Sequence, residues 1–266
     1  MPEGHTIHRY AREHSRLLVG GALAVSSPQG RFAAGAALLD GRLLARVDPY
    51  GKHLFYRWEP DLTLHVHLGL YGGFRTFAGD VPPPTPGTRL QVDSGVVTVR
   101  LAGPTACELL APGQEEHIRA RLGPDPLRRG ADREAVWAAL QRRSAPIGAA
   151  LMDQSVVAGV GNVFRAEALF ACRIDPLLPS RSLDRQRFEV LWATLVRMLR
   201  EGVRAGRIVT VDPADVGKRS RRALAPDEWR YVYRRAGRAC RCCGAEVVAS
   251  TLAARWCYAC PVCQAG

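Results

Sequence analysis

The sequence contains no apolar run that could cross a membrane and comparatively few acidic residues. A membrane helix needs about 20 consecutive apolar residues, and no stretch of the 266 residues approaches that length. The first residues also lack the basic and apolar regions of a signal peptide. We therefore expect a soluble, cytoplasmic protein with no membrane partner.

The 25 Asp and Glu residues are outnumbered by 37 Lys and Arg residues, which gives a formal net charge of +12. Such an excess of arginine suggests a polyanionic partner, most often nucleic acid. The alternative is a GC-rich genome, which the many Ala, Gly and Arg residues fit. Hydrophobic residues make up 47% of the chain, which indicates a globular protein, and its 266 residues are enough for about two domains.

Cysteines are rare outside one short segment, because six of the eight lie between Cys240 and Cys263. In a chain expected to be intracellular, this clustering predicts a metal site and not disulfides. Two CxxC pairs can each give two thiolates to a tetrahedral zinc ion, and four protein ligands make such an ion structural. The predicted ligands of this single zinc ion are Cys240, Cys243, Cys260 and Cys263.

The residues between the two CxxC pairs are numerous enough for a β-hairpin. Val247-Val248 and Trp256 suit its strands. Cys242 and Cys257 lie in the same segment but break the paired spacing. We expect them to be free thiols, with competition for the metal as the alternative.

Hydrophobic periodicity divides the chain into a β-rich part and a helical part. Residues 4 to about 16 have the pattern of an amphipathic helix. From 17 to 111, short apolar runs alternate with Gly and Pro, which predicts a β-sandwich or barrel. The Pro-rich stretch 81–87 predicts a surface loop. After residue 127 the pattern is helical, with Asp132 as a helix cap.

Three segments of the second part complete this prediction. Residues 188–199 have clear helical spacing. The glycines of residues 151–162 suggest a tight turn between two helices. Residues 207–222 are polar and basic, so we expect a mobile loop or contacts with phosphate.

The chain begins Met1-Pro2-Glu3. Removal of Met1 before the small proline ring gives Pro2 a free secondary amine, and an α-amino group titrates near ~8. Such an amine can attack an electrophilic carbon and form a covalent iminium. Glu3 could then supply or accept a proton. A Met-Pro-Glu start by chance is the alternative.

Several short blocks follow one another in a specific order along nearly the whole chain. They are Pro2-Glu3-Gly4, Tyr50-Gly51-Lys52, His67-Leu68-Gly69, Gly123-Pro124-Asp125-Pro126-Leu127, Met152-Asp153-Gln154, Gly159-Val160-Gly161-Asn162, Glu167-Ala168-Leu169-Phe170 and Cys260-Pro261-Val262-Cys263-Gln264. Each block is weak alone, but the ordered set is highly specific. With this set the chain resembles the formamidopyrimidine-DNA glycosylase/endonuclease VIII family of base-excision repair enzymes.

The resemblance implies catalytic roles for four residues. Pro2 would attack C1′ of a damaged nucleotide and expel the base, while Glu3 would protonate the opening sugar. Lys52 would contact phosphate and assist β-elimination. Arg255, five residues before Cys260, would grip phosphates and serve δ-elimination. On composition alone, one Lys or Arg in so basic a chain is an ordinary solvated charge.

The resemblance also implies residues that bind DNA. Asn162, in the turn of a helix–two-turns–helix motif, would hold a phosphate, and Arg121 stands where endonuclease VIII relatives carry a DNA-contacting arginine. Leu70 and Tyr71 would fill the gap left by a flipped nucleotide, although Leu70 could instead belong to the core. Gly69 occupies the place of a glutamine that contacts DNA in endonuclease VIII.

The sequence therefore predicts a multi-domain α/β protein with damaged double-stranded DNA as its partner. Its parts would be an N-terminal catalytic β-sandwich (1–128), a helix–two-turns–helix domain (129–230) and a β-hairpin zinc finger (231–266). We expect a monomer, with DNA in a basic cleft, in the cytoplasm of a bacterium and associated with its nucleoid.

The expected activity is that of a bifunctional DNA glycosylase and abasic-site lyase acting by β,δ-elimination. Leu70-Tyr71 and Ser250-Thr251-Leu252 resemble endonuclease VIII, which favours oxidised pyrimidines, whereas Gly69 and His5-Thr6 depart from it. One alternative is a preference for 8-oxoguanine and formamidopyrimidines. Another is a non-catalytic zinc-ribbon DNA-binding protein, which would need no free N-terminal amine.

Overall fold

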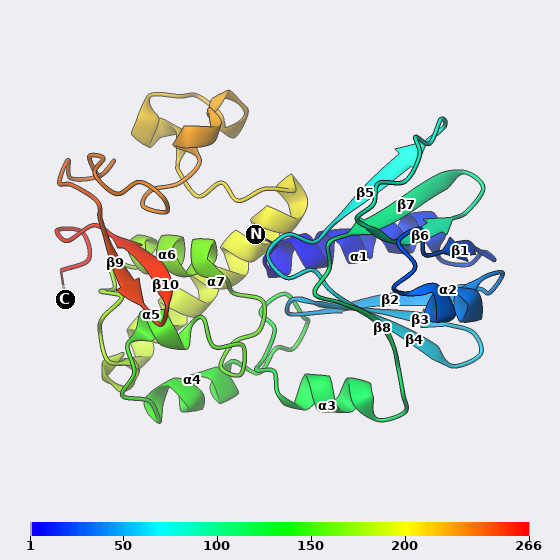
Figure 1. Ribbon diagram of the computed structural model, residues 1–266. Coiled ribbons are helices and arrows are strands. Elements are labelled where there is room, and N and C mark those ends of the chain that lie inside the picture. The colour runs from blue at the N-terminus through cyan, green and yellow to red at the C-terminus, as the bar shows by residue number, and fades with distance from the viewer. Residues whose placement is uncertain (1, 266) are drawn as a thin grey trace. The chain divides into compact units, whose positions relative to one another are not determined.

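The computed structural model describes residues 2–265, and the chain divides into two compact units, Met1–Ala120 and Arg121–Gly266 (Figure 1). Each unit has its own buried apolar core. No membrane-spanning helix is found among residues 2–265. The division into three domains at residues 128 and 230 remains a prediction.

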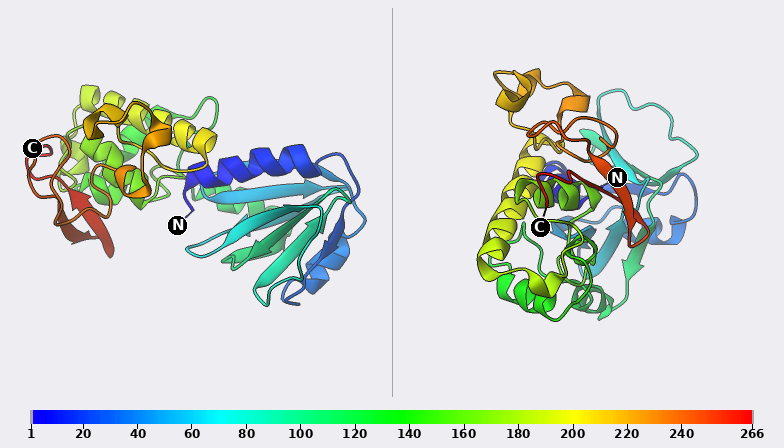
Figure 2. Two further views of the ribbon diagram at one scale, coloured as in Figure 1. Left: turned by 90° about the horizontal axis from the view of Figure 1, so that it is seen from above. Right: turned by 90° about the vertical axis from the view of Figure 1, so that its left-hand side faces the viewer.

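The first unit is a sandwich of two antiparallel four-stranded sheets, with the strand orders β2-β3-β4-β8 and β1-β6-β7-β5 (Figures 1 and 2). Its strands are β1 (Ala24–Ser26), β2 (Leu44–Tyr50), β3 (His53–Trp58), β4 (Leu62–His67), β5 (Gly73–Ala78), β6 (Thr88–Asp93), β7 (Val97–Ala102) and β8 (Ala106–Leu110). Its helices are α1 (Gly4–Leu18), α2 (Ala33–Leu39) and α3 (Gln114–Ala120). The predicted sandwich and the predicted first helix are both confirmed.

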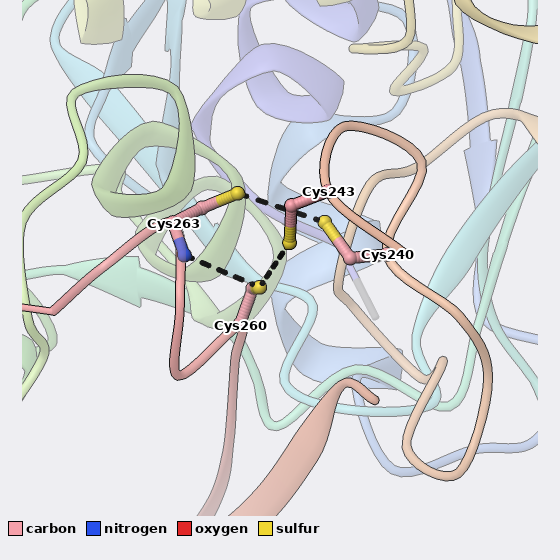
Figure 3. Close-up of side chains that lie close together, drawn as sticks. All are labelled: Cys240, Cys243, Cys260 and Cys263. Carbon is pink, nitrogen blue, oxygen red and sulfur yellow. Dashed lines mark hydrogen bonds between the residues drawn. The ribbon is translucent and has the colours of Figure 1, made fainter. Parts of the chain in front are cut away.

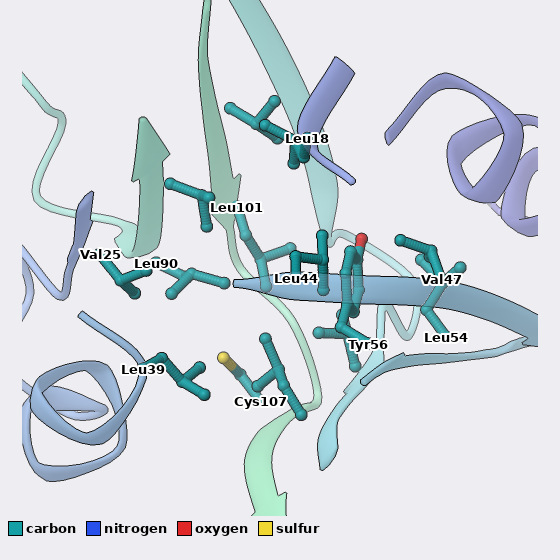
Figure 4. Packing of buried hydrophobic residues seen from close by; sticks show 14 of the residues in the cluster. Leu18, Val25, Leu39, Leu44, Val47, Leu54, Tyr56, Leu90, Leu101 and Cys107 are labelled. Carbon is teal, nitrogen blue, oxygen red and sulfur yellow. The ribbon is translucent and has the colours of Figure 1, made fainter. Parts of the chain in front are cut away.

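The core of the sandwich is apolar and lies between the two sheets. Leu44 and Leu54 of one sheet and Leu90 and Leu101 of the other are at most 3% exposed and pack together there (Figure 4). Each such side chain contributes about 1.5–3 kcal/mol when it is buried. The α2 helix was not predicted within this β-rich region; its sequence is rich in alanine and leucine, which favour helix.

Helix α1 and strand β2 bring two distant parts of the sequence to one end of the first unit. The Gly20 N–H donates to the Leu44 carbonyl at 3.0 Å, so β2 begins where α1 has just ended. β2 then packs back along α1. The 15 residues of α1 rise about 22 Å and the seven of β2 about 23 Å. The start of α1 and the end of β2 therefore lie at the same end.

The second unit is helical, as predicted. Its α-helices are α4 (Arg133–Gln141), α5 (Ile147–Ala150), α6 (Asn162–Ala171) and α7 (Arg185–Ala205), and its 3-10 helices are η1 (Ser180–Ser182), η2 (Pro213–Val216), η3 (Arg221–Ala223) and η4 (Pro226–Glu228). Asp132 caps α4 by accepting the Ala135 N–H at 3.0 Å, which confirms the predicted cap. α7 ends at Gly206, whose φ of 68° is accessible to glycine at little cost.

A β-hairpin ends the second unit. Strands β9 (Val248–Leu252) and β10 (Arg255–Ala259) pair antiparallel, and β10 packs against α6 (Figure 1). The predicted hairpin between the two CxxC pairs is confirmed. Its two-residue turn is Ala253-Ala254, with φ values of 49° and 57°, where Asn and Gly are the favoured residues.

The basic segment 207–222 is more structured than a polar loop. It contains η2 and part of η3, and it buries Ile208, Val209 and Val211. The reason is that two apolar residues at its start pack into buried clusters of the second unit, Ile208 into one and Val211 into another. The Pro-rich stretch 81–87 does lie between strands and is almost wholly exposed, as predicted.

Candidate functional site

The predicted nucleophile and its neighbour stand at the start of α1. Met1 lies outside the described residues. Pro2 is half-buried, and Glu3 is 0% exposed with an extended backbone at the N-cap of α1. The Glu3 carbonyl accepts the Thr6 N–H at 2.9 Å, so the first turn fixes the backbone at this point. The positive end of the helix dipole disfavours a charged ammonium group beside it.

His5 adds a neutral imidazole to the same turn. Burial, followed by the charges of Arg9 and of the N-terminus, lowers the pKa of His5 to about 4. This histidine is therefore uncharged at neutral pH.

Lys52 lies in the two-residue turn between β2 and β3. Tyr50 and His53 are directly paired on either side of it, and Gly51 adopts a φ of 56°. A two-residue hairpin turn needs such a left-handed residue, and glycine supplies it. Because β2 runs back along α1, the turn that carries Lys52 and the Pro2-Glu3 start lie at the same end of the first unit.

The predicted wedge is the tight loop from Leu68 to Gly72. The Gly72 N–H donates to the Leu68 carbonyl at 2.9 Å, and a Cβ at Gly72 would stand 2.3 Å from that oxygen. Leu70 and Tyr71 project from the loop, 50% and 92% exposed. The alternative that Leu70 is a core residue is therefore wrong.

Gly69 has a structural reason to be glycine. Its φ is 65°, and a Cβ there would approach Thr105 Oγ1 to 1.9 Å. A glutamine at this position would require the backbone and Thr105 to move. The loop of this chain therefore presents main chain at residue 69 and large side chains at the next two positions.

Asn162 is the first residue of α6 and is bound to the hairpin. Its Nδ2 donates to the Trp256 carbonyl at 3.0 Å, and its Oδ1 accepts a hydrogen bond from Arg165. Arg165 also donates to the Trp256 carbonyl at 2.8 Å. These hydrogen bonds thus hold the start of α6 against strand β10, which begins at Arg255.

Gln154 shapes the predicted glycine turn between α5 and α6. Its Oε1 accepts the Gly159 N–H, and its Nε2 donates to the Val160 carbonyl, both at 3.0 Å. Arg255 is exposed at the start of β10, directly after the Ala253-Ala254 turn. Arg121 is exposed at the first position of the second unit.

The four predicted cysteine ligands converge (Figure 3). Their sulfur atoms all lie within 4.8 Å of one another, with 3.8 Å between Cys240 and Cys263 and 3.4 Å between Cys243 and Cys260. A tetrahedral zinc–thiolate site with bonds of about 2.3 Å requires sulfur separations of about 3.8 Å. The donor set therefore fits a structural metal ion.

Backbone N–H groups complete this cluster. The Cys242 N–H points to Cys240 Sγ at 3.5 Å, and the Cys263 N–H points to Cys260 Sγ at 3.4 Å. Such donors stabilise negative charge on the sulfur atoms. Within residues 2–265 the cluster does not include the Cys242 or Cys257 thiols.

Two buried charges in α6 were not predicted as site residues. Arg165 and Glu167 are both 0% exposed. The Glu167 carboxylate accepts the N–H groups of Tyr231, Val232 and Tyr233 at 2.8, 3.0 and 2.8 Å, and also the Thr210 hydroxyl. These bonds hold the segment leading to the cysteines. The signal was two opposite charges inside an otherwise apolar helix, where a charge needs hydrogen-bonding partners.

Comparison with known proteins follows the same division of the chain. Residues 1–105 match the formamidopyrimidine-DNA glycosylase N-terminal domain, and residues 122–213 match the formamidopyrimidine-DNA glycosylase H2TH domain. Endonuclease 8 1 of Mycobacterium tuberculosis is 46% identical over 99% of this chain and 100% of its own length. Formamidopyrimidine-DNA glycosylase of Thermus thermophilus is 31% identical over 99% of this chain and 98% of its own.

Solved structures show the same fold. The MutM (Fpg) protein of Thermus thermophilus superposes with a TM-score of 0.79 at 32% identity, covering 99% of both chains. The Lactococcus lactis Fpg in complex with DNA containing an abasic site superposes with a TM-score of 0.82 at 22% identity, covering 99% of this chain and 100% of that one.

These matches extend over both units and include the sandwich, the helical region and the cysteine hairpin. The chain therefore belongs to the formamidopyrimidine-DNA glycosylase and endonuclease 8 family, and it is a DNA glycosylase of base excision repair.

Proposed function

We propose that the protein is a bifunctional DNA glycosylase and abasic-site lyase that removes oxidised bases, pyrimidines in preference, from double-stranded DNA. The observation that carries the proposal is the arrangement at one end of the first unit. A buried Glu3 precedes α1, Pro2 stands beside it, and the turn bearing Lys52 lies at the same end. A non-catalytic DNA-binding protein has no use for this arrangement.

The glycosylase step begins when the Pro2 amine, freed by removal of Met1, attacks C1′ of the damaged nucleotide. The new N–C1′ bond replaces the glycosidic bond, and the base leaves with the electron pair. Glu3 gives a proton to the ring oxygen as the sugar opens, which leaves an iminium linking protein and DNA. For this step the Glu3 carboxyl group must carry a proton.

The lyase step then breaks the DNA strand. Loss of a C2′ proton from the iminium expels the 3′ phosphate by β-elimination, with Lys52 neutralising charge on phosphate. Arg255 assists loss of the 5′ phosphate by δ-elimination. Arg255→Ala should therefore leave β-elimination products that retain the sugar fragment on the 3′ end, which electrophoresis of end-labelled DNA separates from δ-elimination products.

The remaining predicted residues serve to hold damaged DNA. Exposed Leu70 and Tyr71 enter the stack where the nucleotide has been flipped out, with the main chain of Gly69 beside the backbone. Arg121 and Asn162 contact phosphates. The four cysteines would hold one zinc ion, which fixes the hairpin that presents Arg255. We propose that the protein works as a monomer in the bacterial cytoplasm, associated with the nucleoid.

Three observations favour oxidised pyrimidines as the preferred lesions. The Leu70-Tyr71 wedge and the Ser250-Thr251-Leu252 segment of β9 both resemble endonuclease VIII. The identity to an endonuclease 8 (46%) also exceeds that to a formamidopyrimidine-DNA glycosylase (31%). The second candidate is a preference for 8-oxoguanine, which Gly69 favours because it cannot supply the glutamine contact.

Lesion preference is tested by single-turnover cleavage of matched duplexes. They carry thymine glycol, dihydrouracil or 8-oxoguanine, with cytosine opposite 8-oxoguanine and otherwise identical flanks. Faster cleavage of both pyrimidine lesions supports the proposal. Faster cleavage of 8-oxoguanine than of both would overturn the lesion class and leave the chemistry standing.

The role of Glu3 is tested by Glu3→Gln on two substrates. Base excision should be lost far more than cleavage of a preformed abasic site, because protonation of the ring matters most before the base has left. Equal losses on both substrates would show that Glu3 holds the fold of the site and does not act as the acid.

A further inference from the structure

Three histidines lie together at the end of the sheet that carries both loops of the proposed site. His53 begins β3 and His67 ends β4, and the two are directly paired. The Lys52 turn therefore precedes His53, and the wedge loop follows His67 (Figure 1). The ring of His53 lies 5.1 Å from that of His65 and 4.7 Å from that of His67.

Hydrogen bonds fix where the protons of two of these rings lie. Glu108 of β8 accepts a bond from His65, with 2.9 Å between Oε1 and Nδ1. A carboxylate only accepts, so Nδ1 of His65 carries the proton. The Nε2 of neutral His65 is then an acceptor, and His53 Nδ1 lies 2.9 Å from it. His53 must therefore donate from Nδ1.

The surroundings favour a neutral His65. Burial is the largest influence and lowers the pKa of His65, while the neighbouring carboxylates of Glu108 and Glu115 oppose that shift. The Glu108 side chain is 56% exposed and that of His65 only 5%. Two hydrogen bonds thus connect the exposed Glu108 carboxylate, through the buried His65 ring, to His53, the residue next to Lys52.

His67 has the opposite tautomer and belongs to the wedge loop. Its Nδ1 accepts the Gly69 N–H at 3.2 Å, so a neutral His67 carries its proton on Nε2. Burial, and then the nearby His65 and Lys52, lower the pKa of His67. His65 and His67 therefore carry their protons on opposite ring nitrogens, and His53 lies beside both rings as the donor to His65.

Stacking restricts His53 further. Its ring is stacked with that of Phe55 at 6.3 Å, and Phe55 is stacked with His65 at 5.3 Å. The Arg119 guanidinium lies 4.6 Å from the Phe55 ring. Because the Lys52 turn has only two residues, its position follows closely from that of His53.

We propose that the Glu108–His65–His53 chain holds Lys52 in place relative to the wedge loop, so that His53 and His65 are positioning residues for strand cleavage. This inference rests on the proposed function of Lys52. The two histidines need not touch DNA or the reacting atoms, because they act through the turn. A displacement of about 1 Å in such a group can reduce a rate by about 100-fold.

Two variants of His53 test whether the hydrogen bond to His65 must come from the position of Nδ1. His53→Asn places an amide N–H close to the position of Nδ1, whereas His53→Gln places it nearer to Nε2. Single-turnover cleavage of a preformed abasic duplex should fall about tenfold or more in His53→Gln and stay within about threefold in His53→Asn. DNA affinity should change by less than about threefold in both, because no phosphate contact is removed.

Glu108 offers a second matched pair. Glu108→Gln keeps an acceptor for His65 and should stay close to the wild-type rate, whereas Glu108→Ala should lose several-fold. His117→Gln, at an exposed histidine on α3 of the same unit, serves as the control. Equal losses in both His53 variants, or full activity in both, would overturn the proposal.

The tautomers give a readout that does not depend on activity. Long-range proton–nitrogen NMR spectra at neutral pH should show Nδ1–H for His53 and His65, and Nε2–H for His67. The reverse pattern for His53 or His65 would contradict the chain even in an active enzyme. A wild-type protein that cleaved no abasic DNA would instead overturn the proposed function, and the positioning role with it, while the tautomers stood.

Discussion

The two units of this protein hold their functional residues by different means. In the sandwich, apolar side chains between two sheets form the core, and Pro2, Lys52 and Tyr71 project from the ends of elements that this core already fixes. In the second unit, the hairpin with Arg255 has only a small apolar cluster. Instead of a larger apolar core, this region has hydrogen bonds to Glu167 and Asn162 and the cluster of four cysteines. We therefore expect loss of one polar or metal-binding side chain around the hairpin of the second unit to cost more stability than loss of an exposed site residue of the first unit.

We expect the largest effect from loss of one cysteine ligand in the second unit. Cys240→Ser should lose zinc and DNA binding together, because a small module gains its folding free energy from the metal. Metal analysis should give one zinc per wild-type chain and close to none in the variant. Cys242→Ser, next to the cluster but outside it, should keep both; loss of zinc in that variant would contradict the assigned ligands.

We expect the second largest effect from removal of the buried negative charge of Glu167 in α6. In Glu167→Gln the amide NH2 group meets backbone N–H groups that need an acceptor, and we expect a loss of about 2–4 kcal/mol in the free energy of unfolding. Denaturant titration measures it. Glu246→Gln, at an exposed glutamate of the same unit, should change the value little. A similar small change in Glu167→Gln would mean that the bonds to Tyr231–Tyr233 do not hold the hairpin.

The first unit also buries polar side chains, and His14 is one of them. Burial, followed by the charge of Arg9, lowers the pKa of His14 to about 3, and its Nδ1 lies 2.7 Å from the Tyr56 hydroxyl. The unfolded chain takes up a proton near pH 6.5 that the folded chain does not. Stability is therefore greatest above pH 6.5 and falls as the pH drops towards 4, by about 1.4 kcal/mol per pH unit for this group.

This pH dependence is measured by denaturant titration between pH 7 and pH 4.5. His14→Gln should show a smaller slope, and His117→Gln, at an exposed site, should keep that of the wild-type protein. An unchanged slope in His14→Gln would contradict the assignment to His14.

The wedge can be removed without harm to the core beneath it. Tyr71→Ala should weaken binding of lesion-containing DNA by about 1–3 kcal/mol, the usual value of one base–aromatic stack, with no loss of thermal stability. Val96→Ala, at another exposed apolar residue of the same unit, is the matched control for binding to a fluorescent duplex. Equal affinities in the two variants would rule out stacking by Tyr71.

The smallest expected effect is a gain in stability at the hairpin turn. Ala254 has a φ of 57°, which costs an L-residue more than it costs glycine. Ala254→Gly should stabilise the zinc-loaded protein by up to about 1 kcal/mol, whereas Ala249→Gly within β9 should destabilise it by about 0.5–1 kcal/mol. Changes of the same sign in both would show that the turn carries no strain.

Patterns confined to a few residues made most of the fold predictable. Periodicity identified the sandwich, α1 and α7, and spacing identified the hairpin and the four cysteines that the structure brings together. The network of Arg165 and Glu167 was missed because its partners lie more than 40 residues away, at Thr210, Tyr231 and Trp256. The α2 helix was missed because a short apolar run fits either a strand or a helix.

Residue types alone also could not show how the site loops are held. Gly69 looked like a departure from a glutamine, whereas its positive φ and the closeness of Thr105 explain the glycine. Leu70 could have been a core residue until its exposure was known. Such features depend on contacts between strands, which are set by the register of the sheet.

The central claim is that the Pro2 amine bonds to DNA, and borohydride trapping tests it most directly. The chain has only two lysines, Lys52 and Lys218, so few other amines can compete. Reduction during cleavage of an abasic duplex, followed by proteolysis and mass spectrometry, should place all of the adduct on the N-terminal peptide beginning at Pro2. An adduct on the peptide containing Lys52 or Lys218, or strand cleavage with no trapped adduct, would contradict the account.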